Sequence, residues 1–279
     1  MAPSPPVDQA TYWNDEGGRR WVANIERVER MLQPLSKRLL DAAAANLGER
    51  VIDVGCGGGV TSAALAQAVG AQGTVLGVDV SAVILDVARQ RYGYIANLKF
   101  ALGDAASMSV SSTAYDLIAS RFGVMFFPDP AAAFSHLRTA LAPRGRLVFI
   151  CWRALEQNPW MAIPTKAAFE ILPRPEPPAP HAPGPFAFAD AEWLRGLLES
   201  AGFSAVEITA VDESVELGSL DEAVQQMIRM GPAAAAFTAA DAATQNKVSA
   251  AVECGLAPFV SAGRIRLQSA TWLVQALRA

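Results

Sequence analysis

Hydrophobic residues recur along the chain in two rhythms, which predict two kinds of secondary structure. Short apolar runs rich in β-branched residues predict buried strands, at 51–54, 74–78, 98–102, 115–120 and 145–152. Segments with apolar residues three or four positions apart predict helices between these strands, at 60–69, 81–91 and 129–141. Strands that alternate with helices in this way are typical of βαβ units, so we expect a parallel sheet with helices on both faces.

The segments that flank this alternation have a different pattern. Residues 8–31 predict one or two helices with a break at Gly17-Gly18, and Pro34 is expected in the first turn of the next helix. A dense proline cluster at 173–187 predicts a loop, because proline lacks the backbone N–H that helices and central strands use.

The C-terminal third returns to helices and strands. An amphipathic helix is expected from Asp190 to Gly202, and a sixth strand follows at 205–211. Ser219 and Glu222 have the spacing of a capping box, which predicts the start of another helix. The last expected elements are a helix from Thr238 to Gly255 and a strand at 265–277.

These elements predict an α/β fold. We expect a doubly wound, mostly parallel, seven-stranded sheet that carries N-terminal helices and a helical lid insertion. The predicted parts are an N-terminal helical lid segment at 1–48, a core at 49–217 with an insertion near 155–187, a helical cap at 218–262 and a last core strand at 263–279. Additions of this size on an α/β core commonly cover a binding site.

Composition narrows the partners of such a fold. The chain has 279 residues, a net charge of −4 and a pI near 5.3, with no clustered lysine or arginine run, which argues against a nucleic-acid partner. No window is apolar enough to cross a membrane, and residues 1–6 lack the pattern of a signal peptide. Cys56, Cys151 and Cys254 are widely spaced and form no metal-ligand or disulfide pattern. We therefore expect a cytoplasmic protein that acts on a small molecule.

The segment from Asp53 to Gly59 carries the clearest functional signal. It follows a predicted strand and precedes a predicted helix, and four of its seven residues are glycine. Glycines at this place let the backbone turn sharply and approach a ligand, and the amides at the helix start can receive an anionic group. A dinucleotide site would require the pattern G-x-G-x-x-G, but Val60 occupies the position of the third glycine.

Two carboxylates end the neighbouring predicted strands. Asp79 ends the second strand and can accept hydrogen bonds from both hydroxyl groups of a ribose. Asp104 ends the third strand, where it can accept from an adenine amino group while the amide of Ala105 reaches a ring nitrogen. Either aspartate alone is also explained by a helix cap. Asp79 suits several adenosyl cofactors, whereas the second acid favours S-adenosylmethionine over a nicotinamide dinucleotide.

Four segments resemble the motifs of class I S-adenosylmethionine-dependent methyltransferases: Val51–Gly59 the first motif, Val75–Ser81 the second, Tyr115–Phe122 the fourth strand, and Leu141–Leu147 the turn written L-x-P-G-G. Arg144 replaces the first glycine of that turn. The resemblance covers about residues 45–155, with a looser likeness to residue 211 and at the C-terminal strand. The most similar group includes ubiquinone and menaquinone C-methyltransferases and many bacterial natural-product enzymes.

The resemblance implies S-adenosylmethionine as the cofactor and gives the candidate residues their roles. It would place Gly55 and Gly57 beside the methionine half together with Asp53 and Cys56 of the same turn, Asp79 at the ribose, Val80 and Ile84 against the adenine, Asp104 and Ala105 at the adenine edge, Arg121 and Phe122 at the sulfonium, and Trp21 over the methionine end. Trp21 is equally well explained as a core aromatic residue that anchors a helix.

The chemistry itself leaves fewer marks in the sequence. Methyl transfer needs no protein nucleophile and no metal, because proximity and orientation supply much of the rate. Asp129 is better explained as a helix cap before a proline than as a metal ligand, so we expect no metal site. His136 is expected on a helix surface, and His181 in the proline-rich loop, either as a surface residue or as a base carried by a lid. No catalytic residue is assigned.

We therefore predict an enzyme that transfers a methyl group from S-adenosylmethionine to an O, N or C nucleophile of a small, largely apolar acceptor. Two alternatives remain, an NAD(P)-dependent oxidoreductase and a protein of this fold that binds S-adenosylmethionine without methylating. Aromatic and methionine residues either line an apolar acceptor pocket or fill the core, among them Phe126, Phe127, Trp152, Trp160 and Met161. A homodimer is compatible with the sequence.

Overall fold

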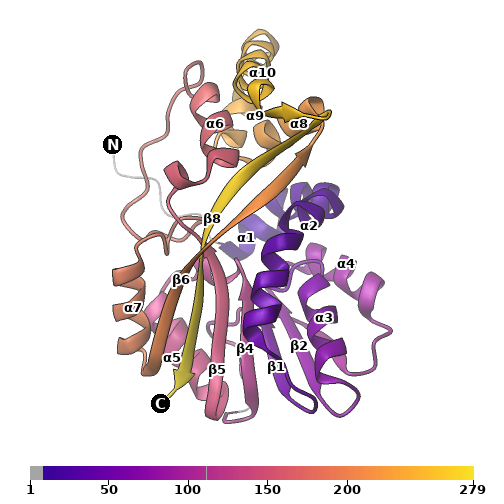
Figure 1. Ribbon diagram of the computed structural model, residues 1–279, viewed down its shortest axis with the longest axis vertical. Coiled ribbons are helices and arrows are strands. Elements are labelled where there is room, and N and C mark those ends of the chain that lie inside the picture. Colours follow the sequence, from indigo (N-terminus) through magenta and orange to yellow (C-terminus); the bar gives the residue numbers. More distant parts are fainter. Residues whose placement is uncertain (1–8, 111) are drawn as a thin grey trace.

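The computed structural model describes residues 9–110 and 112–279, and the expectation for residues 1–6 lies outside this part. Its strands form one sheet in the order β3-β2-β1-β4-β5-β8-β6, with β7 beside β8 (Figure 1). The strands are β1 (Arg50–Val54), β2 (Thr74–Asp79), β3 (Leu98–Leu102), β4 (Tyr115–Arg121), β5 (Leu141–Trp152), β6 (Phe203–Gly218), β7 (Val260–Ser261) and β8 (Arg264–Arg278). The predicted doubly wound, mostly parallel sheet is confirmed, with the two-residue β7 as an addition.

The strand order reverses at the centre of the sheet. β1 pairs in parallel with β2 on one side and with β4 on the other. The strands β2 and β3 are therefore added on one side of β1, and the strands from β4 onward on the other. The central strands are buried, because helices cover both faces. The helices beside the parallel strands are α3 (Val60–Val69), α4 (Ala82–Tyr92), α5 (Pro130–Ala140) and α7 (Ala191–Ser200). Ligands of such sheets bind at the carboxyl ends of the strands, next to this reversal.

The last two long strands form an arm that extends beyond the sheet. β6 and β8 pair antiparallel along most of their length, and Figure 1 shows them reaching past the carboxyl end of β5. We expected the sixth strand to end near residue 211, but it runs to Gly218 because Val215 and Leu217 continue the inward alternation and are fully buried. The arm carries a helical cap, formed by α8 (Leu220–Met230), α9 (Ala234–Ala239) and α10 (Ala242–Leu256) with α6 (Pro159–Ala168) packed beside it.

The N-terminal segment differs from its prediction in two places. The helices α1 (Gln9–Asn14) and α2 (Glu16–Ala43) are separated at Asp15, and Gly17-Gly18 lie in the first turn of α2. Both glycines are buried there, and an added Cβ at Gly17 would overlap the Tyr12 ring, so this position has no room for a side chain. Pro34 lies inside α2 and does not start a helix. The apolar face around it is fully packed, which holds the helix continuous across the missing hydrogen bond.

The cap contains a further difference. We expected one helix from Thr238 to Gly255, but the chain forms α9 and then α10, which starts after Asp241. The carboxylate of Asp241 accepts a hydrogen bond from the amide of Thr244 at 2.7 Å, so it is the helix cap. Ala240 is extended and separates the two helices.

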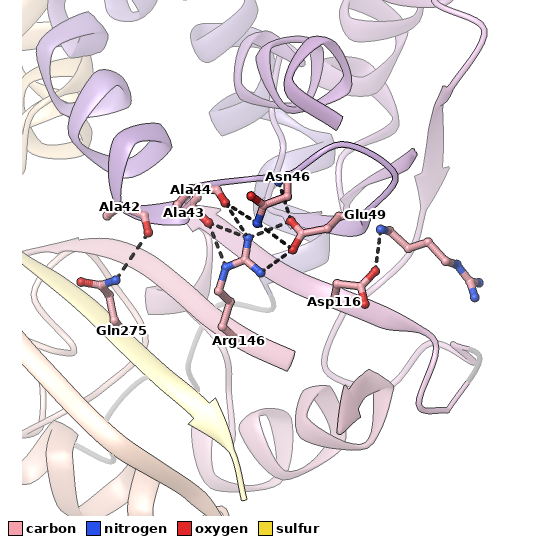
Figure 2. A network of polar contacts seen from close by, with 9 residues as sticks. Ala42, Ala43, Ala44, Asn46, Glu49, Asp116, Arg146 and Gln275 are labelled. Atoms are coloured by element: carbon pink, nitrogen blue, oxygen red, sulfur yellow. Dashed lines mark hydrogen bonds and ion pairs between the residues drawn. The ribbon is translucent and has the colours of Figure 1, made fainter. Parts of the chain in front are cut away.

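The C-terminal end of α2 is fixed to the sheet by Arg146 of β5 (Figure 2). The Arg146 guanidinium donates to the carbonyls of Ala43 and Ala44 at 2.8–3.0 Å and pairs with both carboxylate oxygens of Glu49 at 2.8 Å. These carbonyls lack helical partners, so the guanidinium acts as their cap. Burial raises the pKa of Glu49, but the hydrogen bonds from Arg146 and Asn46 outweigh it and hold that pKa below its ordinary value.

Candidate functional site

The glycine turn between β1 and α3 lies at the centre of the carboxyl edge. Gly55, Gly57 and Gly59 have φ angles of 66°, 54° and 84°, a left-handed conformation that glycine adopts at little cost. At Gly55 space is also short, since an added Cβ would lie 2.6 Å from the Cα of Gly123. Gly123 follows β4, so two glycines allow the turns after the two central strands to touch.

Gly123 was not singled out from the sequence, and it gives a first prediction. A Cβ at Gly123 would lie 2.6 Å from the carbonyl oxygen of Val54 and 2.7 Å from the Cα of Gly55, both backbone atoms. Gly123→Ala should therefore separate the two turns and lower the free energy of unfolding by about 1–3 kcal/mol, as overpacking does. Chemical denaturation measures this. Gly196→Ala is the control, because Gly196 lies in α7 with open space around it, and a neutral or stabilising effect is expected there. Equal stability of Gly123→Ala and the parent would contradict the prediction.

Asp79, at the end of β2, binds the glycine turn directly. Its two carboxylate oxygens accept hydrogen bonds from the amides of Gly57 and Ser81, each at 2.9 Å. Burial raises the pKa of Asp79, against the opposing effect of these backbone amides. The carboxylate thus lies between the first and second βα connections, where the predicted ribose contact would require it.

The remaining predicted adenine residues lie near the ends of β2 and β3. Asp104 is exposed, and its carboxylate accepts from the amide of Ala106 at 2.8 Å, which is a turn-stabilising contact. Ala105 and Ile84 are buried. The amide of Gly103 donates to the carbonyl of Asp79 at 3.0 Å, so the ends of β2 and β3 adjoin.

Cys56 and Asp53 are buried within the turn. The Asp53 Oδ2 accepts from the hydroxyls of Thr61 and Ser62 at 2.7 and 2.6 Å, which ties the end of β1 to the start of α3. Its other oxygen, Oδ1, is buried without a hydrogen-bond partner. Burial raises the pKa of Asp53 and raises that of the Cys56 thiol well above its ordinary value, so Cys56 is a neutral packing residue.

Arg121 and Phe122 leave β4 in different directions. The Arg121 guanidinium is buried toward α2 and donates to the Ser36 hydroxyl at 2.6 Å. Phe122 has a φ of 66°, which is costly for a residue with a side chain and is typical of functional sites. Its ring stacks on Trp152, with centroids 4.1 Å apart. The carboxyl end of β4 is thus flanked by the Arg121 guanidinium on the side of α2 and by the stacked rings of Phe122 and Trp152.

Trp21 belongs to an aromatic group that joins the N-terminal helices to the segment after β4. Its ring meets Trp13 edge-on at 5.9 Å, and Trp13 meets Phe126 edge-on at 5.5 Å. Phe126 ends a short 3-10 turn, η1 (Val124–Phe126), that follows Gly123. Trp21 is only partly buried. Its contact with Trp13 fits a packing role, and its exposed part leaves room for the predicted contact with the methionine end.

The N-terminal helices are also anchored to the connection after Asp79. The Asn14 amide donates to the carbonyl of Val80 and accepts from the amide of Ala82, both at 2.8 Å. The Ser81 hydroxyl donates to the carbonyl of Trp13 at 2.6 Å. No sequence pattern indicated this contact, because the partners are more than 60 residues apart.

Asn14→Ala tests the anchor. Loss of two hydrogen bonds to one backbone loop should loosen α1 from the β2–α4 connection while leaving the core folded, at a cost of about 1–2 kcal/mol. Hydrogen exchange should then show faster exchange confined to 9–24 and the Ala82 amide. Asn24→Ala serves as control, since the Asn24 amide donates only within α2, to the carbonyl of Arg20. Unchanged exchange in Asn14→Ala would contradict the anchoring role.

Both histidines are engaged with neighbouring groups. His136 is half-buried and its Nε2 lies 2.9 Å from the carbonyl of Met108, so it is less solvated than we expected. The His181 ring stacks on Trp193 at 3.9 Å, with an interplanar angle of 4°. His181 therefore fastens the proline-rich segment to α7. Among residues 9–110 and 112–279, no group of three or more acidic, cysteine or histidine side chains could hold a metal ion.

Comparison with known proteins agrees with this arrangement. Residues 45–171 match a family model described as a methyltransferase domain. Aklanonic acid methyltransferase from Streptomyces is 31% identical over 42% of this chain and 54% of its own length. Demethylmenaquinone methyltransferase from Staphylococcus aureus is 29% identical over 45% of this chain and 60% of its own length. The matches thus span little more than half of these relatives.

A solved structure extends the likeness of the fold to nearly the whole chain. Phosphoethanolamine N-methyltransferase 2 from Haemonchus contortus, crystallised with S-adenosylhomocysteine, superposes with a TM-score of 0.62 at 15% identity. The superposition covers 99% of this chain and 61% of the other. The predicted resemblance to methyltransferases is therefore confirmed in sequence for residues 45–171, and the superposition shows a similar fold over nearly the whole chain.

Proposed function

We propose that this chain, whose residues 45–171 form a methyltransferase domain, transfers a methyl group from S-adenosylmethionine to a small, largely apolar acceptor. The observation that carries the proposal is the hydrogen bond from the amide of Gly57 to the Asp79 carboxylate, which lies where the strand order reverses. An adenosyl group placed there has a ribose acceptor on one side and a glycine turn on the other.

The residues present fit such a cofactor. The buried Asp53 Oδ1 has no partner within the protein, and a buried carboxylate oxygen without a partner is costly. The cofactor's ammonium group would supply that partner, directly or through water. Asp79 would hold the ribose, Asp104 and Ala105 the adenine edge, and Val80 and Ile84 its faces. The rings of Phe122 and Trp21 would border the reactive end.

The chain contributes binding, orientation and exclusion of water. When bound, S-adenosylmethionine supplies a methyl group on a cationic sulfur, whose charge disappears during transfer. A dry, apolar wall does not oppose such a step, and alignment of the two partners can supply about 7–11 kcal/mol of the barrier. The stacked rings of Phe122 and Trp152, with Trp160 at 5.2 Å from Trp152, form such a wall.

The cap supports an apolar acceptor. α8 presents buried Met227 and Ile228, and α6 presents Trp160 and Met161, with the two helices in contact. Methionine and aromatic surfaces adapt to apolar ligands of varied shape. We propose that the cap at 218–262 selects the acceptor while 49–217 holds the cofactor.

Mass spectrometry tests the proposal. The protein is incubated with S-adenosylmethionine and fractionated small-molecule extracts, and one fraction should contain a compound heavier by one CH₂ unit. Calorimetry with NAD⁺ separates the oxidoreductase alternative, which Val60 disfavours. Tight binding of S-adenosylmethionine without any methylated product would instead support a non-methylating protein of this fold.

Some expectations stay predictions. None of the helices in the described residues is long and apolar enough to cross a membrane. A cytoplasmic location, a homodimer and the absence of a nucleic-acid partner are among these predictions.

A further inference from the structure

One face of α2 lies across the carboxyl ends of the two central strands. Ile25, Glu29 and Ser36 on this face approach the glycine turn and Arg121: Ile25 and Glu29 lie against Gly58, and Ser36 accepts from Arg121. None of these α2 residues belongs to the 45–171 segment that matches the methyltransferase domain. The contacts are therefore made by a part of the chain that precedes the matched domain.

Glu29 is the charged residue of this face, and only half of its carboxylate is engaged within the protein. Its Oε2 accepts from Arg91 of α4 at 2.8 Å, whereas its Oε1 is buried and has no hydrogen-bond partner. An added Cβ at Gly58 would lie 2.6 Å from this Oε1 and 2.5 Å from the Cδ1 of Ile25. Gly58 has no positive φ, so a glycine is needed here for space. A free carboxylate oxygen thus rests against the glycine turn.

The surrounding charges favour a cation. The negative charges of Asp53 and Glu29 both stabilise the charged form of the buried Arg121 guanidinium, although burial lowers its pKa. Asp79 lies close enough to Asp53 to raise the pKa of Asp53 by charge repulsion. Each of these two carboxylates, Glu29 and Asp53, has one buried oxygen without a hydrogen-bond partner. Buried carboxylate oxygens are normally satisfied, so the cluster calls for a hydrogen-bond donor that carries positive charge.

We propose that Glu29 receives the α-ammonium group of the cofactor's methionine end, beside the glycine turn, while Arg121 faces the α-carboxylate. This inference rests on the proposed function and assigns a cofactor contact to α2. Arg91 holds the Glu29 side chain in place through Oε2, so Arg91 is a positioning residue. The N-terminal helix therefore distinguishes an adenosyl compound that carries an amino-acid tail from one that does not.

Calorimetry with two ligands tests this assignment. S-adenosylhomocysteine has the amino-acid tail, whereas 5′-methylthioadenosine lacks it. Glu29→Gln should weaken S-adenosylhomocysteine binding roughly 10- to 100-fold, the range expected for a charged hydrogen bond, and should leave 5′-methylthioadenosine binding unchanged. Glu26→Gln is the matched control, because Glu26 pairs with the same Arg91 at 3.6 Å but is exposed, and both affinities should match those of the parent.

A second variant moves Glu29 without changing its charge. Gly58→Ala should push the Glu29 and Ile25 side chains aside and cause the same selective loss of S-adenosylhomocysteine. Circular dichroism verifies that each variant is folded. Unchanged S-adenosylhomocysteine affinity in Glu29→Gln, or equal losses for both ligands, would overturn the assignment. A parent protein that binds neither ligand would instead contradict the proposed function, and the assignment would fall with it.

Discussion

Asp79→Ala is expected to weaken binding of S-adenosylhomocysteine by at least about 100-fold, since each charged hydrogen bond to a ribose hydroxyl contributes about 1.5–3 kcal/mol. The loss has a second source within the protein. The Asp79 carboxylate accepts from the amides of Gly57 and Ser81, so its removal also frees the glycine turn. Calorimetry should show the loss for 5′-methylthioadenosine as well, because both ligands contain the ribose.

A second variant compares the ribose contact with the proposed adenine contact. Asp104→Ala removes a carboxylate from the neighbouring strand end, where Asp104 is exposed and accepts one hydrogen bond from the amide of Ala106. We expect a loss of about tenfold there, as for a single hydrogen bond. If Asp79→Ala binds either ligand as tightly as the parent, the ribose assignment is wrong.

Arg146→Ala is expected to lower the free energy of unfolding by about 3 kcal/mol, the largest effect on stability that we predict. The substitution leaves the carbonyls of Ala43 and Ala44 without their cap and Glu49 without its ion-pair partner, as Figure 2 makes clear. Both side chains of the ion pair are mostly buried, with exposed fractions of 21% and 16%, so water compensates only in part. Chemical denaturation at neutral pH measures the loss.

Arg146→Lys is the informative control, because an ammonium group keeps the charge but has only three donors for the five hydrogen bonds that the guanidinium makes to Ala43, Ala44 and Glu49. We expect it to recover only part of the stability. The pKa of Glu49 is lower in the folded protein than in the unfolded chain, so its contribution is complete above the unfolded pKa and is lost as the pH falls through the folded pKa. The difference between Arg146→Ala and the parent should therefore shrink in acid. A difference that stays constant with pH would contradict the role given to the ion pair.

Local patterns were sufficient for the parallel half of the fold. The apolar runs that became β1 to β4 are short, buried on both faces and bounded by turn residues, so their bounds were predicted within about a residue. The helix starts at Ser81, Asp129, Asp190 and Ser219 were predicted for the same reason, since each cap depends on residues within three positions.

Long-range packing decided the elements that the patterns missed. Pro34 is a helix breaker by itself, but the packed faces of α2 override it. The outer half of β6 continues the inward alternation only at Val215 and Leu217, too few residues to predict a strand, and the partner strand β8 that pairs with them lies about 50 residues further along the chain. Asn14, Glu29 and Gly123 carry no local signal, because their importance comes from the segments that they touch. The positions of the acids and glycines of the site were predicted, and the role of each in binding stays a proposal.

The arm formed by β6 and β8 has a consequence for the proposed division of the chain into a cofactor-binding part and a cap. The helices α8, α9 and α10 lie in the sequence between the two strands of this arm, and the match to the methyltransferase-domain model ends at residue 171, before them. Replacement of 219–262 by the corresponding piece of a relative would alter few contacts around β1 and β2. We therefore expect that exchange of this cap would change acceptor preference while disturbing, outside the arm and α6, mainly the contact of α8 with α2, where Gln226 meets Met31.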